Sequence, residues 1–253
     1  MPNIHIAHYP GANMAASGDR APIGRALRAT LTGVVILGTL LLIPAGLVPG
    51  GTWLWPRGLA YLAAYGAIIG VGNLALAIWR PAHFQVRQQS VVAPREKRQP
   101  RLDAAGTVAL LAFGSAWVVS IPLDVFRVHL LPAPSWQVSL AGGAVSLLGV
   151  ALTPLAVWEN RFTTPNVQHQ SGQTIVRSGV YRLVRHPIYL GNLLMAAGAT
   201  LWLGSYTGLW GFAVLLVSTV GRIAIEETHL RANFPEYADY ARAVRGRLIP
   251  FVI

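Results

Sequence analysis

The sequence predicts an all-α membrane protein: a polytopic bundle of about six transmembrane helices followed by a cytoplasmic C-terminal amphipathic helix. Hydrophobic residues make up 53% of the 253 residues and charged residues only 11%, whereas soluble domains carry about 25% charged residues. The mean hydropathy is +0.48. Six apolar runs approach the roughly 20 residues that a helix needs to cross the hydrocarbon core of a bilayer.

In chain order, the apolar runs are 29–48, 58–79, 104–122, 136–157, 187–203 and 206–225. The fifth run is short, and only Gly204 and Ser205 separate it from the sixth, so we expect these two helices to form a tight antiparallel hairpin. Gly142 and Gly143 lie inside the fourth run, where small residues allow neighbouring helices to pack closely.

Positive charge indicates the orientation of the bundle. Of the 20 lysines and arginines, all but Arg57 and Arg127 fall in segments that six spans place on one side of the membrane. These segments are 20–28, 80–101, 161–185 and 222–247. Basic loops stay cytoplasmic, so we expect both termini in the cytoplasm. The abundance of alanine, glycine and arginine suggests a bacterial protein, and hence an inner (plasma) membrane location.

The net charge of +11 is explained by orientation and by anionic lipid headgroups, so no nucleic-acid partner is expected. The absence of cysteine excludes disulfides, thiolate metal sites and a cysteine nucleophile. His169, His186 and His229 are dispersed and lack the two-histidine spacing of zinc proteases, so no metal is expected. We divide the chain into a flexible arm (1–24), four transmembrane helices (25–157) and a C-terminal region with nearly all the candidate chemistry (158–253).

Two ionisable clusters lie at the ends of the predicted hairpin. Arg185-His186-Pro187 begins its first helix, and Pro187 suits a first helical turn. Glu226-Glu227 ends its second helix. Ionisable groups at a membrane boundary indicate a functional site by default, although His186 alone is more often a helix cap or a headgroup contact.

Arg222, Glu226 and His229 share a face of the last apolar helix, because residues four apart on a helix are neighbours. An isolated Arg222–Glu226 pair is most simply a snorkelling salt bridge. Beyond it, Pro235 interrupts the helix, and 236–244 forms a short amphipathic helix. This helix either lies on the membrane surface or folds under the bundle and closes a cofactor cavity.

Taken together, these motifs resemble the isoprenylcysteine carboxyl methyltransferase and phospholipid methyltransferase superfamily of integral membrane enzymes. The resemblance covers roughly residues 158–253. Its motifs are Ser178-Gly179-Val180-Tyr181, Arg185-His186-Pro187-x-Tyr189-x-Gly191, Glu226-Glu227-x-x-Leu230, then Phe234, Tyr237 and Tyr240, and the basic close before Leu248-Ile249-Pro250.

The resemblance implies methyl transfer from S-adenosyl-L-methionine without a Rossmann fold. It implies that Glu226 binds the cationic end of the cofactor, that Arg222 holds the acceptor, and that Arg247 is a second catalytic residue. Arg245 competes for that last role because the tail is about one residue longer than the usual pattern. The remaining cofactor contacts that it implies are Gln173 (where the family commonly has histidine), Thr174, Ile175, Val176, Tyr181, His186, Pro187, Ile188 and Tyr189.

The expected reaction is carboxyl O-methylation of a lipidic or prenylated acceptor drawn from the membrane, such as an isoprenylcysteine-like or isoprenoid acid. The first alternative is N-methylation of phosphatidylethanolamine, for which His186, Glu227 or His229 would be the general base. Membrane sterol reductases that use a nicotinamide cofactor rank below, because this chain is short for them. A non-enzymatic scaffold or transporter would leave the ordered motifs unexplained.

Overall fold

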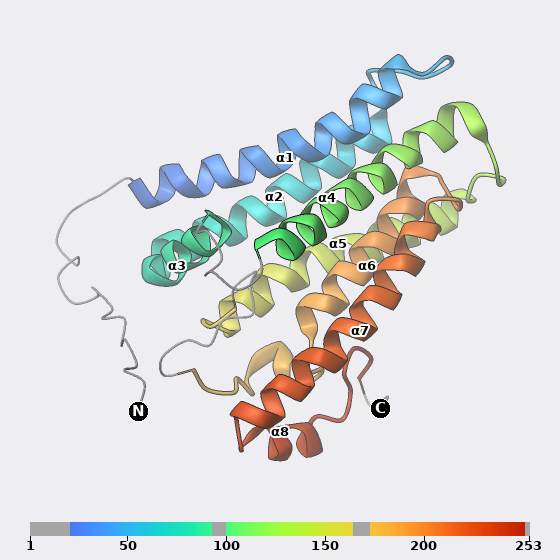
Figure 1. The fold of residues 1–253 in the computed structure, drawn as a ribbon. Helices are drawn as coiled ribbons and strands as arrows, with labels where there is room; N and C mark the ends of the chain where they lie inside the picture. Colours follow the sequence, from blue (N-terminus) through green and yellow to red (C-terminus); the bar gives the residue numbers. More distant parts are fainter. Residues whose placement is uncertain (1–20, 93–99, 164–172, 251–253) are drawn as a thin grey trace.

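The computed structural model describes residues 21–92, 100–163 and 173–250, and this part of the chain contains helices and no strand. Six long helices lie side by side in one bundle (Figure 1). They are α1 (Ala21–Leu47), α2 (Pro56–Trp79), α4 (Pro100–Leu123), α5 (Trp136–Glu159), α6 (Pro187–Leu203) and α7 (Leu209–Asn233). The all-α prediction is confirmed. Five spans are long and apolar enough to cross a membrane, and α6, with 17 residues, is shorter.

The helices match the six predicted runs, with differences at their ends. Helix α6 has the predicted bounds, and α7 continues beyond residue 225 to Asn233. Helix α1 begins at Ala21, inside the segment assigned to the flexible arm; residues 1–20 of that arm lie outside the described residues. Large apolar side chains on the bundle, such as Leu31 and Val217, are 62% and 74% exposed. Apolar surface of this extent suits lipid contact, and the chain is an integral membrane protein.

One helix was missed by the sequence analysis, which treated 80–101 as a linker over the headgroups. Helix α3 (Pro81–Val92) follows α2 directly. Its Phe84 is 1% exposed and packs with Leu76, Ala77 and Val157. The apolar contact of Phe84 with the ends of α2 and α5 explains why a polar segment is ordered here.

Helices α5 and α6 approach each other most closely at glycines, as Gly142 and Gly143 predicted. A Cβ atom added to Gly198 would lie 2.3 Å from the carbonyl oxygen of Gly142, and one added to Gly149 would lie 2.5 Å from that of Gly191. Neither distance is compatible with a side chain, so glycine at these positions is required for the two backbones to touch.

The far end of the bundle is fastened by Asp124, the first residue of the π-helix η1 (Asp124–Val128) that extends α4. Its Oδ2 accepts a 2.6 Å hydrogen bond from the Ser205 hydroxyl in the α6–α7 turn, and its Oδ1 accepts one from the Leu130 amide. Gly204 begins this turn with φ +98°, a left-handed conformation that favours glycine. The tight hairpin is therefore confirmed.

The six long helices alternate in direction (Figure 1), so the end of α5, the start of α6 and the end of α7 meet at one end of the molecule. Two short helices, the 3₁₀-helix η2 (Gly179–Arg182) and α8 (Tyr237–Ala243), lie beyond them. Both ionisable clusters of the predicted hairpin lie at this end.

Candidate functional site

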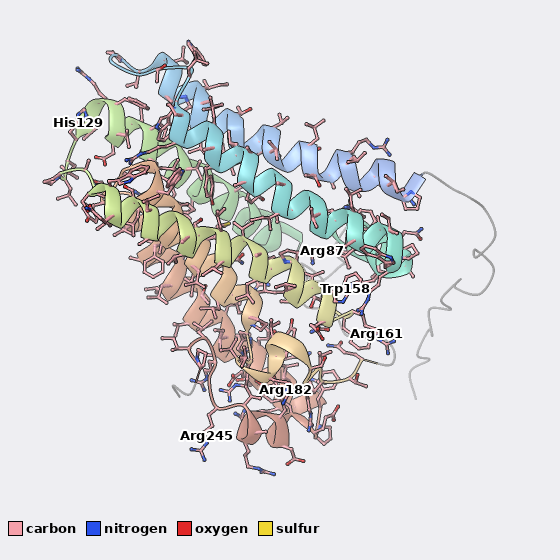
Figure 2. The ribbon with its side chains drawn as sticks, turned by 180° about the vertical axis from the view of Figure 1, so that it is seen from behind. Arg87, His129, Trp158, Arg161, Arg182 and Arg245 are labelled. Carbon is pink, nitrogen blue, oxygen red and sulfur yellow. The ribbon has the colours of Figure 1, made fainter. Side chains whose placement is uncertain are left out.

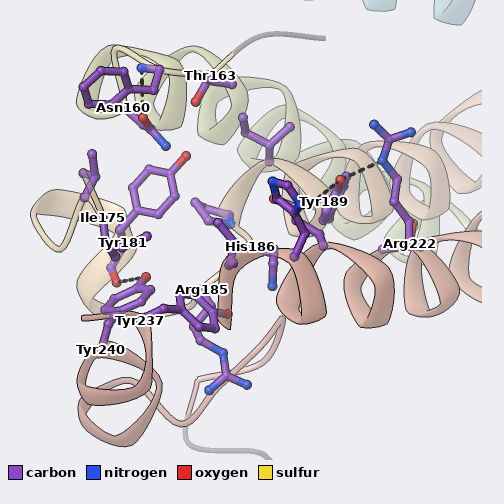
Figure 3. Close-up of a pocket in the computed structure, with 18 of the residues that line it drawn as sticks. Asn160, Thr163, Ile175, Tyr181, Arg185, His186, Tyr189, Arg222, Tyr237 and Tyr240 are labelled. Carbon is purple, nitrogen blue, oxygen red and sulfur yellow. Dashed lines mark hydrogen bonds between the residues drawn. The ribbon is translucent and has the colours of Figure 1, made fainter. Parts of the chain in front are cut away.

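A cavity of about 510 Å³ lies at this end of the bundle (Figure 3). Its wall is formed by the segment after α5, the segment before η2, the start of α6, the end of α7 and α8. Eleven of the twelve predicted site residues line it. They are Gln173, Thr174, Ile175, Val176, Tyr181, His186, Pro187, Ile188, Tyr189, Arg222 and Glu226.

The start of α6 fixes the first group of these side chains. Pro187 is the first residue of α6 and His186 is its N-cap, as the sequence predicted. His186 is 5% exposed, and its ring stacks on Tyr189 with centroids 5.6 Å apart. The ring is thereby held between Tyr189 and the acidic end of α7.

Tyr189 connects the two charged residues that α7 contributes to the cavity. Its hydroxyl donates a 2.7 Å hydrogen bond to Glu226 Oε2 and accepts a 2.8 Å hydrogen bond from Arg222 Nε. No ion pair joins Arg222 directly to Glu226 in the described part of the chain, so the simple salt bridge considered from their spacing is wrong. The bridging hydroxyl keeps the guanidinium and the carboxylate at separate positions in the cavity wall.

Glu227 is 4% exposed and does not line the cavity. Its Oε1 accepts a 2.9 Å hydrogen bond from Arg185 Nε and lies 3.3 Å from His186 Nε2. Its Oε2 accepts a 3.3 Å hydrogen bond from Arg247 Nε. A carboxylate shared among these partners is poorly suited to take a proton from a substrate, which argues against the general-base role considered for Glu227.

Arg247 is the predicted site residue that the structure does not place in the cavity wall. It contacts Glu227, which in turn contacts the lining residues Arg185 and His186. Arg245 is exposed and lies at the outer edge of this end of the molecule (Figure 2). Of the two tail arginines, Arg247 is thus the one connected to the site, through Glu227. The family resemblance implied a catalytic role for Arg247, but the direction of a side chain in an irregular tail cannot be predicted from sequence.

Helix α8 contributes two buried tyrosines to the wall of the cavity. Tyr237 and Tyr240 are 1% and 3% exposed and pack against Ile175. The Tyr240 hydroxyl donates a 2.8 Å hydrogen bond to the Tyr181 carbonyl, and burial raises the pKa of Tyr240. The sequence allowed this helix either to lie on the membrane surface or to fold under the bundle. The burial of Tyr237 and Tyr240 shows that it folds under the bundle.

The tail after α8 is fastened to the loop before α6. The Arg185 amide donates to the Gly246 carbonyl at 2.9 Å, and the His186 amide donates to the Arg247 carbonyl at 3.0 Å. The Arg185 guanidinium also donates to the carbonyls of Ala241 and Val244. These bonds fix the floor of the cavity against its wall.

Several lining residues were not predicted. Arg87 comes from α3, and Asn160, Phe162 and Thr163 follow α5. Arg87 was missed because 80–101 was taken only as an orientation signal, and the three residues after α5 were missed because they precede the recognised motifs. Another group of lining residues comes from inside the apolar helices α6 and α7. These are Asn192, Leu215, Ser218 and Thr219, and polar residues within a span are a signal that could have found three of them.

The described residues contain no group of three or more histidines and acids positioned to hold a metal ion. His169, one of the dispersed histidines, lies outside the described residues. His229 lines the cavity and contacts Asn233.

Comparisons with known proteins match the same region. Residues 138–237 match the family model described as phospholipid methyltransferase. A protein of Oryza sativa subsp. indica named "probable protein-S-isoprenylcysteine O-methyltransferase" is 34% identical over 122 residues, which are 46% of this chain and 63% of the relative. The cobalt-zinc-cadmium resistance protein CzcN of Cupriavidus metallidurans is 30% identical over 109 residues, 42% of this chain and 50% of that protein. The chain therefore spans less than two thirds of the length of these curated relatives.

The fold has a counterpart among solved structures. The eukaryotic intramembrane Ras methyltransferase, isoprenylcysteine carboxyl methyltransferase, aligns with a TM-score of 0.53 at 24% identity, over 89% of this chain and 75% of that one. At this identity the likeness establishes the fold. Over residues 138–237 the chain is similar to the phospholipid methyltransferase family, and over 122 residues it is similar to a probable protein-S-isoprenylcysteine O-methyltransferase.

Proposed function

We propose that this protein transfers a methyl group from S-adenosyl-L-methionine to the carboxylate of a lipidic acceptor, such as an isoprenylcysteine-like or isoprenoid acid. The observation that carries the proposal is the position of Arg222. Its guanidinium lines a cavity whose wall extends from the α8 end of the bundle to Leu215 and Ser218 in the apolar part of α7. A cation at the boundary between a polar and an apolar compartment suits the acidic head of a membrane lipid.

The cavity fits the proposed methyl donor. Its volume of about 510 Å³ lies in the range of about 300–1,000 Å³ typical of small-molecule sites. Glu226 offers a carboxylate for the positively charged amino group of the donor. The rings of Tyr181, Tyr189 and Tyr240 line the same cavity, and aromatic faces attract cations such as a sulfonium.

In this reaction the main task of the protein is to hold the methyl donor and the carboxylate acceptor in the correct orientation. S-adenosyl-L-methionine supplies a methyl group on a positively charged sulfur, so transfer to a carboxylate forms an O–CH₃ bond, breaks the S–CH₃ bond and leaves a neutral thioether. Arg222 orients the carboxylate and holds it away from water, and Tyr189 fixes Arg222. Orientation and exclusion of water supply most of the acceleration in such a site.

An amine acceptor, as in phosphatidylethanolamine methylation, fits less well. The amine is protonated near neutral pH, so its cation would meet the Arg222 guanidinium. It would also need a base. His186 and Glu227 are engaged with each other, which leaves His229 as the lining candidate.

We also propose that the cavity faces the cytoplasm and that the protein resides in a bacterial inner membrane. Positively charged loops favour the cytoplasmic side. Of the described arginines, Arg161, Arg182 and Arg245 lie at the cavity end, with His129 at the opposite end (Figure 2). A cysteine introduced at Arg245 is the test: with a cytoplasmic cavity it reacts with an impermeant thiol reagent in opened cells and not in intact ones.

The proposed activity is tested with the full chain in lipid nanodiscs and methyl-labelled S-adenosyl-L-methionine. A farnesylcysteine analogue and phosphatidylethanolamine are offered in separate reactions, and the products are treated with base. Volatile, base-released label from the farnesylcysteine reaction is the expected result, because methyl esters hydrolyse in base. Base-stable label in phosphatidylethanolamine would replace the proposal with N-methylation. If neither acceptor is labelled, binding of the donor is measured directly. Donor binding would mean that the acceptors were wrong, and its absence would refute the proposed activity.

A further inference from the structure

A second hollow lies on the outer side of the cavity wall and is lined by four arginines. We call it the arginine groove, and its arginines are Arg80, Arg161, Arg177 and Arg182. Its volume is about 630 Å³. Arg161 and Arg182 lie on the face shown in Figure 2, near the ends of α5 and η2. The groove thus gathers positive charge from segments far apart in the sequence.

The one carboxylate lining the groove does not neutralise these arginines. Glu159 Oε2 accepts a 2.7 Å hydrogen bond from the Ser178 hydroxyl, and its side chain packs against Gly179, where an added Cβ would lie 2.4 Å from Glu159 Cδ. Glu159 therefore secures the turn before η2. In the part of the chain that the structure describes, no ion pair involves an arginine of the groove, and Arg161, Arg177 and Arg182 are exposed.

The groove lies beside the ends of two predicted spans, where lipid headgroups are expected. Arg80 directly follows Trp79, the last residue of α2, and Arg161 comes two residues after the end of α5. Trp79 is 69% exposed and meets Trp158 edge to face, with centroids 6.3 Å apart. Exposed tryptophans at the ends of spans mark the membrane interface. The Arg80 guanidinium lies 4.2 Å from the centroid of the Trp158 ring, which fixes this arginine at that depth.

We propose that the arginine groove binds the phosphate headgroup of an anionic phospholipid from the surrounding leaflet. Guanidinium groups bind phosphate oxygens through paired, charge-assisted hydrogen bonds. Several arginines around one hollow at the ends of two spans match such a ligand better than a soluble phosphate compound, because the acyl chains of a bound lipid would lie along the apolar ends of α2 and α5. This site is separate from the cavity, whose apolar extension lies along α7.

The bound lipid would support the wall of the cavity. Thr174, Ile175 and Val176 line both hollows, so a headgroup in the groove packs against the outer side of residues whose inner side faces the cavity. We therefore expect anionic lipid to increase the affinity of the cavity for the methyl donor. This consequence rests on the proposed function, whereas lipid binding itself does not.

The binding test uses the full chain purified into nanodiscs of equal parts phosphatidylcholine and phosphatidylglycerol, released gently for native mass spectrometry. Wild-type protein is expected to retain phosphatidylglycerol at least fivefold more than phosphatidylcholine. The double variant Arg161→Gln/Arg182→Gln is expected to lose most of this preference. The matched control, Arg28→Gln/Arg245→Gln, removes the same charge from exposed positions outside the groove and is expected to retain it.

Equal lipid retention by the groove variant and the wild type would overturn the proposal, as would an equal loss of preference in the control. If the double variant elutes as aggregate, the single variants Arg161→Gln and Arg182→Gln are measured in its place. Donor affinity is then compared in nanodiscs with and without phosphatidylglycerol. Lipid preference without donor binding would refute the proposed function and leave the lipid site standing.

Discussion

Arg185 Nε donates a 2.9 Å hydrogen bond to Glu227 Oε1, and both side chains are about 95% buried. This ion pair joins the loop before α6 to the end of α7 across 42 residues of sequence. Arg185 lines the cavity whereas Glu227 does not, and Arg247 and His186 complete the cluster around the same carboxylate. The two ionisable motifs of the hairpin are therefore parts of one structural cluster.

Replacing Glu227 by glutamine should destabilise the protein strongly. Removing one partner of a buried ion pair costs about 3–5 kcal/mol, because the remaining charge stays buried without compensation. The measurement is the thermal unfolding midpoint in detergent, followed by near-ultraviolet circular dichroism. Asp239→Asn, which removes an exposed carboxylate paired with Arg242, is the control and should change the midpoint little. A midpoint for Glu227→Gln close to that of the control would contradict a stabilising role for the pair.

Replacing Arg222 by alanine should abolish methyl transfer to a carboxylate acceptor and leave binding of the methyl donor largely intact. Arg222 is exposed, so the substitution should not unfold the protein. Initial rates with the farnesylcysteine analogue and donor affinity by calorimetry measure the two effects. We expect a rate reduction of at least 100-fold and a change in donor affinity below threefold. Full activity in this variant would refute the role of Arg222.

Replacing Tyr189 by phenylalanine should separate the contribution of the hydroxyl from that of the ring. The ring that stacks on His186 is retained, whereas the bridge between Arg222 and Glu226 is lost. Hydrogen bonds to charged groups are worth about 1.5–3 kcal/mol, so we expect methyl transfer to slow by at least tenfold with little change in unfolding midpoint. Tyr206→Phe, in the turn at the far end of the bundle, serves as the control. Equal rates for the two variants would argue against the bridge.

Replacing Gly198 by leucine should disrupt the contact between α5 and α6. Even an added Cβ would lie 2.3 Å from the Gly142 carbonyl oxygen and 2.4 Å from the Ser146 amide nitrogen. Overpacking of this kind typically costs about 1–3 kcal/mol, and here backbone atoms are the obstacle. Yield of folded protein by size-exclusion chromatography and the unfolding midpoint are the measurements. Gly221→Leu, at a position on α7 with nothing within 4 Å of an added Cβ, should behave like the wild type.

The stability of the α2–α3 corner should fall as the pH is lowered through the range between about 6.5 and 4. Burial, together with the charges of Arg87 and Arg80, lowers the pKa of His83 from 6.5 to about 4. Between these values the unfolded chain binds a proton on His83 that the folded chain does not, so unfolding becomes easier as the pH falls. Unfolding midpoints at pH 7 and pH 4.5 measure the effect. In His83→Leu the difference between the two midpoints should be smaller, and an unchanged difference would exclude His83 as its source.

The sequence predicted the helices better than the connections between them. The length of the apolar run and the position of its flanking glycine predicted the bounds of α6 as they are observed. An apolar run of this length folds as a helix because backbone hydrogen bonds in lipid must be satisfied within the segment. Helix α3 was missed because its order depends on burial of Phe84 against α2 and α5. Arg87, Asn160 and Thr163 in the cavity wall were missed because they precede the recognised motifs in the sequence and meet them only in the folded chain.

The sequence by itself determined the all-helical membrane fold, the hairpin of α6 and α7, and eleven of the residues that line the cavity, since hydrophobic length and motif order are local properties. Tertiary structure alone decided how the charges are partnered. It inserted the Tyr189 hydroxyl between Arg222 and Glu226, and it placed Arg247 on Glu227 outside the cavity. Pairing of side chains depends on distances across helices and turns, and the linear order of residues does not specify those distances.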